Sequence, residues 1–270
     1  TVSSDILPSA GFGITSAIKA GSAFAIRALF DFSTCSDVQL LQVIERGNRL
    51  FLKQENLAAD AFTALFSKAG CAVFTDYGTA SYDVVPLSFP DKKILLTDAK
   101  VPRFSVWNED ALRQPENVLL LGELKERKGG IYGGWQYEEN PTEVNEVLNI
   151  VTEDMRRRLL CIMREHQCVL EARRALETGS FGKFARAVNR SYESMRDLYN
   201  SSCPEIDWLL KRLSEISPNF DAPRNPTTCG RITGKGFGRC IYTMLSVEDI
   251  PLFQAKLAEY ERIFVFHPAC

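Results

Sequence analysis

Small and apolar residues recur with helical spacing along much of the chain. Ile14, Ala17, Ile18, Ala25 and Leu29 fall on one stripe, which predicts a helix over residues 14–32. The same spacing predicts further helices over residues 37–56, 56–69, 152–178, 180–198, 203–214 and 251–262.

Residues at the ends of these segments support the predicted helices. Ser36 suits an N-cap, and Pro204 falls in a first turn, where its missing N–H costs little. Gly70 and Gly179 suit the position that follows a helix. The helix over 37–56 is expected to bury one face, made by Leu40, Val43, Ile44, Gly47, Leu50 and Phe51.

Short runs rich in β-branched and aromatic residues lie between the helical segments and predict strands. They cover residues 1–7, 71–77, 81–87, 93–98, 240–245 and 263–267, and the run at 93–98 is expected to be buried. A proline-containing linker near residue 90 predicts two domains, 1–88 and 89–270. Residues 104–150 show no clear pattern. Helices and strands mixed in this order predict an α+β fold.

Composition describes an ordinary globular protein. The 270 residues are 45% hydrophobic and 24% charged, with a formal net charge of −2. No basic excess indicates a nucleic-acid partner, and no apolar run of about 18 residues indicates a membrane span. The chain begins at Thr1 without a secretory leader, so we expect a trimmed or C-terminal portion of a longer protein.

The eight cysteines are scattered and form no Cys-x-x-Cys pair. This spacing argues against a zinc site and against a disulfide framework, so we expect reduced thiols and a cytoplasmic location. His166 and His267 are the only histidines. Because His166 falls in the apolar stripe of its predicted helix, we interpret it as a packed side chain.

The stretch Pro8-Ser9-Ala10-Gly11-Phe12-Gly13-Ile14-Thr15-Ser16-Ala17 is a glycine-rich turn that opens a helix. Glycine permits positive φ and close approach of a ligand, and a helix N-terminus favours phosphate. A lone Gly-x-Gly is also common in tight turns without a ligand. A second glycine-dense stretch covers 230–239, and Asp60 interrupts an apolar helix face between the two.

Four motifs in order resemble the galactokinase branch of the GHMP small-molecule kinases. Residues 8–17 are similar to that branch's Pro-x-Gly-x-Gly-Leu-Ser-Ser-Ser-Ala stretch, and Leu57-Ala58-Ala59-Asp60-Ala61-Phe62 to its Gly-Ile-Met-Asp-Gln-Phe. Residues 194–207 are close to Ser-Leu-Arg-Asp-x-Tyr-x-Val-Ser-Cys-Pro-Glu-Ile-Asp, and 231–240 resemble Arg-Met-Thr-Gly-Gly-Gly-Phe-Gly-Gly-Cys. The Cys71–Leu87 hairpin also resembles a family segment. Residues 104–154 match poorly.

The resemblance implies a GHMP-kinase-like α+β fold: a partial N-terminal domain over 1–88 and a ferredoxin-like C-terminal domain with added helices over 89–270. It further implies a sugar kinase that uses ATP and Mg²⁺ to phosphorylate the C1 hydroxyl of galactose or a relative. Asp60 would be the catalytic aspartate and Ser16 a metal ligand. The ATP phosphates would lie on Gly11, Phe12, Gly13, Ile14, Thr15, Ser16 and Ala17, and the second glycine loop would contribute Gly234, Lys235, Gly236 and Gly238.

Several departures from the family pattern leave a second hypothesis open. Ala17 replaces a family serine, Ala61 replaces a glutamine, and Lys19, Lys235 and Arg239 replace small residues. The three cations could supply charge, fill the nucleotide pocket or point outward. The N-terminal Gly-Arg-x-Asn-x-Ile-Gly-Glu-His-x-Asp segment, which holds most sugar contacts in the family, is absent. The alternative is therefore a non-catalytic, sugar- or nucleotide-binding regulator, and the missing segment of the parent protein is an expected partner.

Overall fold

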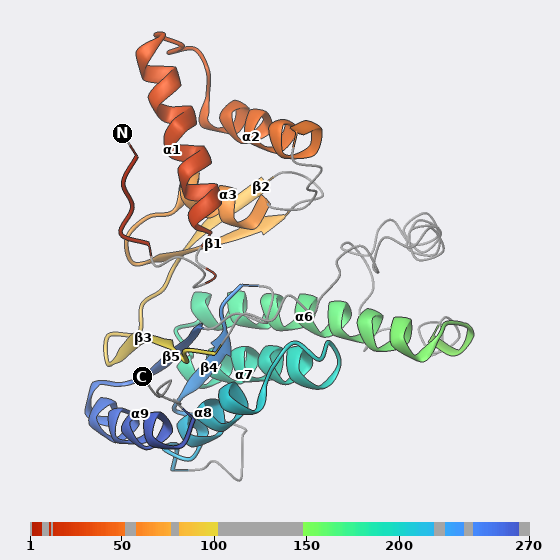
Figure 1. The fold of residues 1–270 in the computed structure, drawn as a ribbon, viewed down its shortest axis with the longest axis vertical. Helices are drawn as coiled ribbons and strands as arrows, with labels where there is room; N and C mark the ends of the chain where they lie inside the picture. The colour runs from red at the N-terminus through yellow and green to blue at the C-terminus, as the bar shows by residue number, and fades with distance from the viewer. Residues whose placement is uncertain are drawn as a thin grey trace, which may run out of the picture. The chain divides into compact units, whose positions relative to one another are not determined.

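The computed structural model describes residues 2–6, 11, 13–51, 58–76, 81–101, 148–218, 225–234 and 240–264. The chain forms two compact units that meet in sequence between Phe89 and Pro90. Figure 1 traces them in colour from the N-terminus to the C-terminus. We describe each unit by itself.

Unit 1 contains three helices and one β-hairpin. The helices are α1 (Ile14–Leu29), α2 (Asp37–Phe51) and α3 (Ala58–Phe66), and the strands are β1 (Cys71–Asp76) and β2 (Ser81–Pro86). β1 and β2 pair antiparallel, with Cys71 opposite Pro86 and Asp76 opposite Ser81.

Local sequence explains how these helices begin and end. Ser36 and Gln39 form a reciprocal capping pair at the start of α2: the Gln39 backbone N–H donates to Ser36 Oγ at 3.3 Å, and the Ser36 N–H donates to Gln39 Oε1 at 2.8 Å. Gly179 takes φ +63° directly after the C-cap of α6 (Glu153–Glu177) in unit 2, as expected of a glycine that follows a helix. Gly70 does not close α3 as predicted: α3 ends at Phe66, and Gly70, with φ +72°, lies in the turn that leads into β1.

The core of unit 1 joins α2, α3 and the hairpin. Leu41, Ala61, Phe62 and Phe66 are buried together. The Phe66 ring stacks on Tyr82 of β2, with ring centroids 4.1 Å apart. This packing holds α3 against α2 and the hairpin. It thereby sets the position of the first turn of α3, which carries Asp60.

Unit 2 contains a three-stranded antiparallel sheet with helices around it. The strands are β3 (Lys92–Asp98), β4 (Cys229–Ile232) and β5 (Cys240–Ser246), in the order β3-β5-β4. The helices are α6 (Glu153–Glu177), α7 (Phe181–Asp197), α8 (Pro204–Ser214) and α9 (Ile250–Phe264), with a short 3₁₀ turn at Val247–Asp249.

One apolar cluster fills unit 2 between the sheet, α8 and α9. Its members are Ala99, Val101, Tyr192, Ile206, Leu209, Leu210, Leu213, Ile232, Ile241, Leu245, Phe253 and Tyr260. Gly230 allows α8 to lie close to β4, because a Cβ there would be 2.6 Å from Leu210 Cδ2 and 2.8 Å from Leu213 Cδ2. β4 is an edge strand, and Asn189 of α7 bonds its backbone at Thr228 and Gly230.

The structure confirms the predicted helices and the hairpin, and it corrects four other predictions. Residues 2–6 form no strand. Ile263 and Phe264 belong to α9, so the closing strand is wrong there, and residues 265–267 lie outside the described residues. β3 is an edge strand with exposed Ile94 and Leu96, so it is not buried. β4 was not predicted, because its Cys-Gly-Arg-Ile sequence was interpreted as part of a glycine loop.

The buried face of α2 also differs from the prediction. Leu40, Leu41, Ile44 and Asn48 are buried, whereas Val43, Leu50 and Phe51 are exposed. The helix is turned so that Leu41 reaches the α3 core. Within the part of the chain that the structure describes, no helix is long and apolar enough to cross a membrane.

Candidate functional site

The first backbone N–H groups of α1 have no partner within the helix. Gly13 lies in the left-handed region, at φ +65° and ψ +30°, and precedes the first helical residue, Ile14. The first intrahelical bond runs from the Ala17 N–H to the Gly13 carbonyl at 2.9 Å. Ile14, Thr15 and Ser16 therefore point their N–H groups out of the helix end. The N-cap residue Gly13 has no side chain that could cap α1, and the first turn of α1 holds no acidic residue.

Asp60 lies directly against Gly13. A Cβ built on Gly13 would be 2.9 Å from Asp60 Cγ and 3.0 Å from Oδ2. Asp60 is exposed at the start of α3, whereas the following residues, Ala61 and Phe62, are buried. Gly13 and Asp60 are 47 positions apart in the sequence, and the structure brings these two predicted site residues together. It places the carboxylate at the end of α1 where the helix dipole is positive.

The hydroxyls of the first turn of α1 differ in exposure. Thr15 is exposed, whereas Ser16, the predicted metal ligand, is only 4% exposed. Among the described residues, no group of three or more Asp, Glu, His or Cys side chains could hold a metal ion. Gly11, with φ +79°, is described, and Phe12 lies outside the described residues.

Lys19 forms a hydrogen bond with Asn48, a residue that the sequence analysis did not identify. Its Nζ donates to Asn48 Oδ1 at 2.5 Å, and Asn48 is only 5% exposed. The contact ties α1 to α2, so this lysine has a structural partner of its own. The signal was present in the sequence: Asn48 is polar, yet it follows Leu40 and Ile44 at helical spacing.

The structure describes the second glycine stretch, residues 230–239, only over residues 230–234. Gly234 has φ +66° and follows the buried Thr233. The predicted site residues Lys235, Gly236 and Gly238 lie outside the described residues, as does Arg239. This stretch belongs to unit 2, whereas Gly13 and Asp60 belong to unit 1.

A polar junction next to this stretch was missed at the sequence level. Glu165 Oε2 of α6 accepts hydrogen bonds from Ser191 Oγ of α7 at 2.9 Å and from Arg231 Nη2 of β4 at 3.1 Å. Arg231 also lies against Met195 of α7, with Nε 3.2 Å and Nη2 2.9 Å from the sulfur. Glu165 lies one helical turn after the buried Cys161. That spacing is the only sequence feature that would have indicated a partly buried glutamate at this position.

Burial and charge act in opposite directions on Glu165. Desolvation raises the pKa of its carboxyl group, while Arg231 and the Ser191 hydrogen bond lower it, and the net direction is upward. Burial is also the main cause that raises the pKa of Cys161 to about 12, and Glu165 adds to this shift. His166 beside it is half-buried in α6, as expected of a packed side chain.

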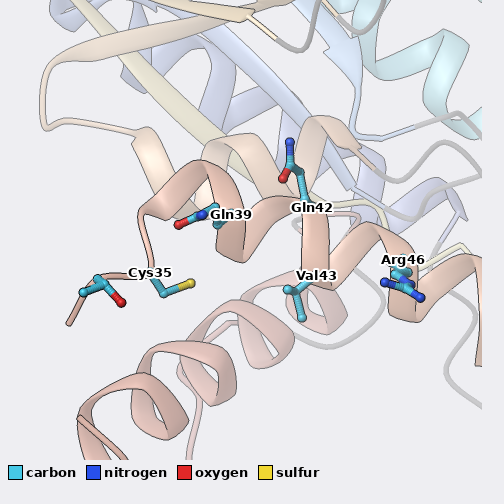
Figure 2. A pocket seen from close by; sticks show the side chains of 6 residues that line it. Cys35, Gln39, Gln42, Val43 and Arg46 are labelled. Atoms are coloured by element: carbon cyan, nitrogen blue, oxygen red, sulfur yellow. The ribbon is translucent and has the colours of Figure 1, made fainter. Parts of the chain in front are cut away.

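A surface hollow in unit 1 lies apart from the predicted site residues. It has a volume of about 450 Å³ and is lined by Thr34, Cys35, Gln39, Gln42, Val43 and Arg46. Figure 2 shows these side chains on α2 and on the loop before it. None of its described lining residues carries a carboxylate.

Known proteins resemble the chain in sequence. No protein-family model matches the chain. A Treponema pallidum protein assigned as a galactokinase is 35% identical over all of this chain and 66% of its own length. A Thermotoga maritima galactokinase is 28% identical over 99% of this chain and 72% of its own length.

A solved structure shows the same fold. The crystal structure of Lactococcus lactis galactokinase complexed with galactose matches with a TM-score of 0.80 and 20% identity, over 96% of this chain and 65% of that one. The shared α+β fold is that of the GHMP small-molecule kinases, which confirms the predicted fold class. The chain belongs to the galactokinase-like branch of that family and spans about two thirds of the length of these relatives.

Proposed function

We propose that the protein is a sugar kinase that transfers the γ-phosphoryl group of ATP to the C1 hydroxyl of galactose or a related sugar. The contact between Gly13 and Asp60 is the observation that carries this proposal, because it joins a helix end whose N–H groups suit a phosphate to a carboxylate. Similarity to proteins named galactokinase, over all or nearly all of this chain, supports it.

The residues around Gly13 suit the needs of phosphoryl transfer. In the reaction, a sugar oxygen forms a bond to Pγ, the bond from Pγ to the β–γ bridging oxygen breaks, and ADP leaves with the electron pair. The hydroxyl proton passes to Asp60, or Asp60 orients the hydroxyl. Catalysis of this kind needs positioning and neutralised charge more than covalent chemistry. The donors of Ile14, Thr15 and Ser16 would hold phosphate oxygens.

Magnesium would enter together with the nucleotide. The Ser16 hydroxyl is a hard oxygen donor of the kind that Mg²⁺ accepts, and the ion commonly binds one or two protein ligands along with substrate phosphates. The described residues offer no carboxylate cluster for it. We therefore propose ATP-bound Mg²⁺, with Ser16 as the residue that would contact it.

The test is a coupled ADP-release assay with MgATP and a panel of hexoses, run on the unmodified protein and on Asp60→Asn. We expect turnover with galactose or a relative, and a loss of at least about a hundredfold in kcat for Asp60→Asn. ATP affinity should persist in the variant, because the phosphate donors remain. Retained turnover in Asp60→Asn would remove the aspartate from its role.

A non-catalytic regulator is the second candidate, and the altered residues favour it. Ala17 and Ala61 replace polar residues of the family pattern. Lys19, a third departure, has its own partner in Asn48. The same assay separates the candidates: nucleotide binding without turnover of any sugar supports the regulator, and no nucleotide binding at all excludes the kinase.

A further inference from the structure

The described partner of Lys19 is a neutral side chain. Lys19 is partly buried in α1, and its Nζ donates to Asn48 Oδ1 of α2 at 2.5 Å. Asn48 is 5% exposed, so the packing around it holds the amide in place. Because an amide carries no charge, this hydrogen bond fixes the ammonium group without cancelling its positive charge.

Lys19 also lies beside the first turn of α1. It follows Ser16 by three residues, and residues at this spacing are neighbours on a helix surface. A helical side chain leans toward the N-terminus of its own helix. The stem of Lys19 therefore leans toward the turn where the N–H groups of Ile14, Thr15 and Ser16 have no partner within the helix.

An ammonium group at this place is unfavourable for the fold alone. The N-terminal end of a helix carries partial positive charge, which repels a nearby cation, and the first turn of α1 holds no acidic residue to offset it. A partly buried cation also loses water that a single amide oxygen replaces only in part. A neutral side chain could join α1 to α2 without either cost, so the charge of Lys19 indicates an anionic ligand.

We propose that Lys19 binds the phosphate groups of ATP and that Asn48 is the positioning residue that directs its ammonium group toward them. The inference rests on the proposed function and deepens it, because it adds a fixed cation to the backbone donors of the same helix end. Lys19, Asn48 and this helix end all belong to unit 1. A cation supplied by the protein makes nucleotide binding less dependent on Mg²⁺.

The test measures the Kd of ATP by calorimetry, with Mg²⁺ and in EDTA, for the unmodified protein, Lys19→Met and Lys68→Met. Lys68 is an exposed lysine of unit 1 beyond the C-terminal end of α3, so Lys68→Met removes the same charge away from the site. We expect Lys19→Met to raise the Kd about tenfold with Mg²⁺, since one charge-assisted bond is lost. The factor should be larger in EDTA, where no metal ion shares the phosphate charge. Lys68→Met should leave both Kd values unchanged.

Two further variants separate phosphate binding from folding, also if Lys19→Met does not fold. Asn48→Asp keeps an oxygen acceptor for Lys19 but cancels its charge, so the melting temperature should hold while the Kd of ATP rises. This variant is measured in EDTA, where the new carboxylate has no metal ion to bind. Lys19→Arg keeps the charge, and its Kd should stay closer to that of the unmodified protein than the Kd of Asn48→Asp does.

The outcomes distinguish this inference from the proposed function. If the unmodified protein binds ATP and Lys19→Met and Asn48→Asp bind it equally well, Lys19 has only a structural role. A Kd that rises by the same factor with Mg²⁺ and in EDTA would also overturn the phosphate contact. Neither result touches the proposed function. No binding of ATP by the unmodified protein would overturn the proposed function, and this inference with it.

Discussion

At the scale of single residues, Gly13 combines a left-handed backbone conformation with a close contact to Asp60. Its φ of +65° is costly for a residue with a side chain, and a Cβ would lie 2.9 Å from Asp60 Cγ. We expect Gly13→Ala to destabilise the protein by about 1–3 kcal/mol and to lower activity by displacing Asp60. Thermal unfolding and kcat measure the two effects.

Gly21→Ala provides the matched control for Gly13→Ala. Gly21 lies inside α1, with no atom within 4 Å of an added Cβ, so alanine should stabilise it by about 0.5–1 kcal/mol. In an Asp60→Ala background the part of the Gly13→Ala penalty that is due to the carboxyl group should disappear, while the 3.0 Å contact with the Cβ of residue 60 remains. An unchanged penalty in that background would mean that strain alone, and not the carboxylate, makes Gly13 necessary.

Glu165 gives a pH prediction at the same scale. Its pKa is raised in the folded protein, so the folded state holds the proton above the pH at which the unfolded chain releases it. This contribution to stability is complete below the unfolded pKa and is lost as pH rises through the folded pKa. The difference in unfolding free energy between the unmodified protein and Glu165→Gln should therefore change across mildly acidic pH. A difference that stays constant between pH 4 and 8 would contradict the shift.

At the scale of elements, Gly230 sets how closely α8 approaches β4. An added Cβ would be 2.6 Å from Leu210 Cδ2 and 2.8 Å from Leu213 Cδ2, and both leucines are buried in the core. We expect Gly230→Ala to cost about 1–3 kcal/mol, as overpacking does. In Gly182→Ala the added Cβ meets only the far end of the Asn225 side chain, so denaturant unfolding should show a smaller loss. Equal losses would contradict this account of the packing.

The elements also show what the sequence can predict. Helix ends were accurate where a local signal marked them, as at Ser36 and Gly179. The predicted buried face of α2 was wrong because an apolar stripe indicates only that one face is buried, and the α3 core buries Leu41 in place of Val43. β4 was missed because its short Cys-Gly-Arg-Ile run opens the glycine stretch, and its cover by Asn189 comes from a distant part of the chain.

In the candidate site, too, the sequence predicts individual residues but not the contacts that packing creates between them. The turn at Gly13 and the carboxylate Asp60 could be predicted from motifs, but their contact depends on how α1 packs against α3. The junction of Glu165, Ser191 and Arg231 could not be predicted, because a charged residue inside a helix carries no local signal of its partners.

At the scale of the whole molecule, unit 1 exposes many apolar side chains. Leu29, Phe30, Phe32 and Phe51 are each more than half exposed on α1, α2 and the loop between them. The chain spans 66% of the length of its Treponema pallidum relative. Exposed apolar side chains in this number commonly mark a surface that contacts another segment or chain.

This exposure predicts dye binding. The protein should bind the apolar dye ANS, and Phe30→Ser together with Phe32→Ser should lower the ANS fluorescence, because both rings are more than half exposed. Equal ANS fluorescence from the unmodified protein and the double variant would show that these two side chains do not bind the dye.

The most direct test of the account is whether phosphate reaches the anomeric oxygen. ³¹P NMR of the full-length protein with MgATP and galactose should show a sugar 1-phosphate signal that grows as ATP declines to ADP. The signal should be absent for Asp60→Asn, although that variant still binds MgATP. A 1-phosphate product formed at an undiminished rate by Asp60→Asn, or bound ATP that is never consumed by the unmodified protein with any hexose, would contradict the claim that Asp60 and the Gly13 turn form a working kinase site.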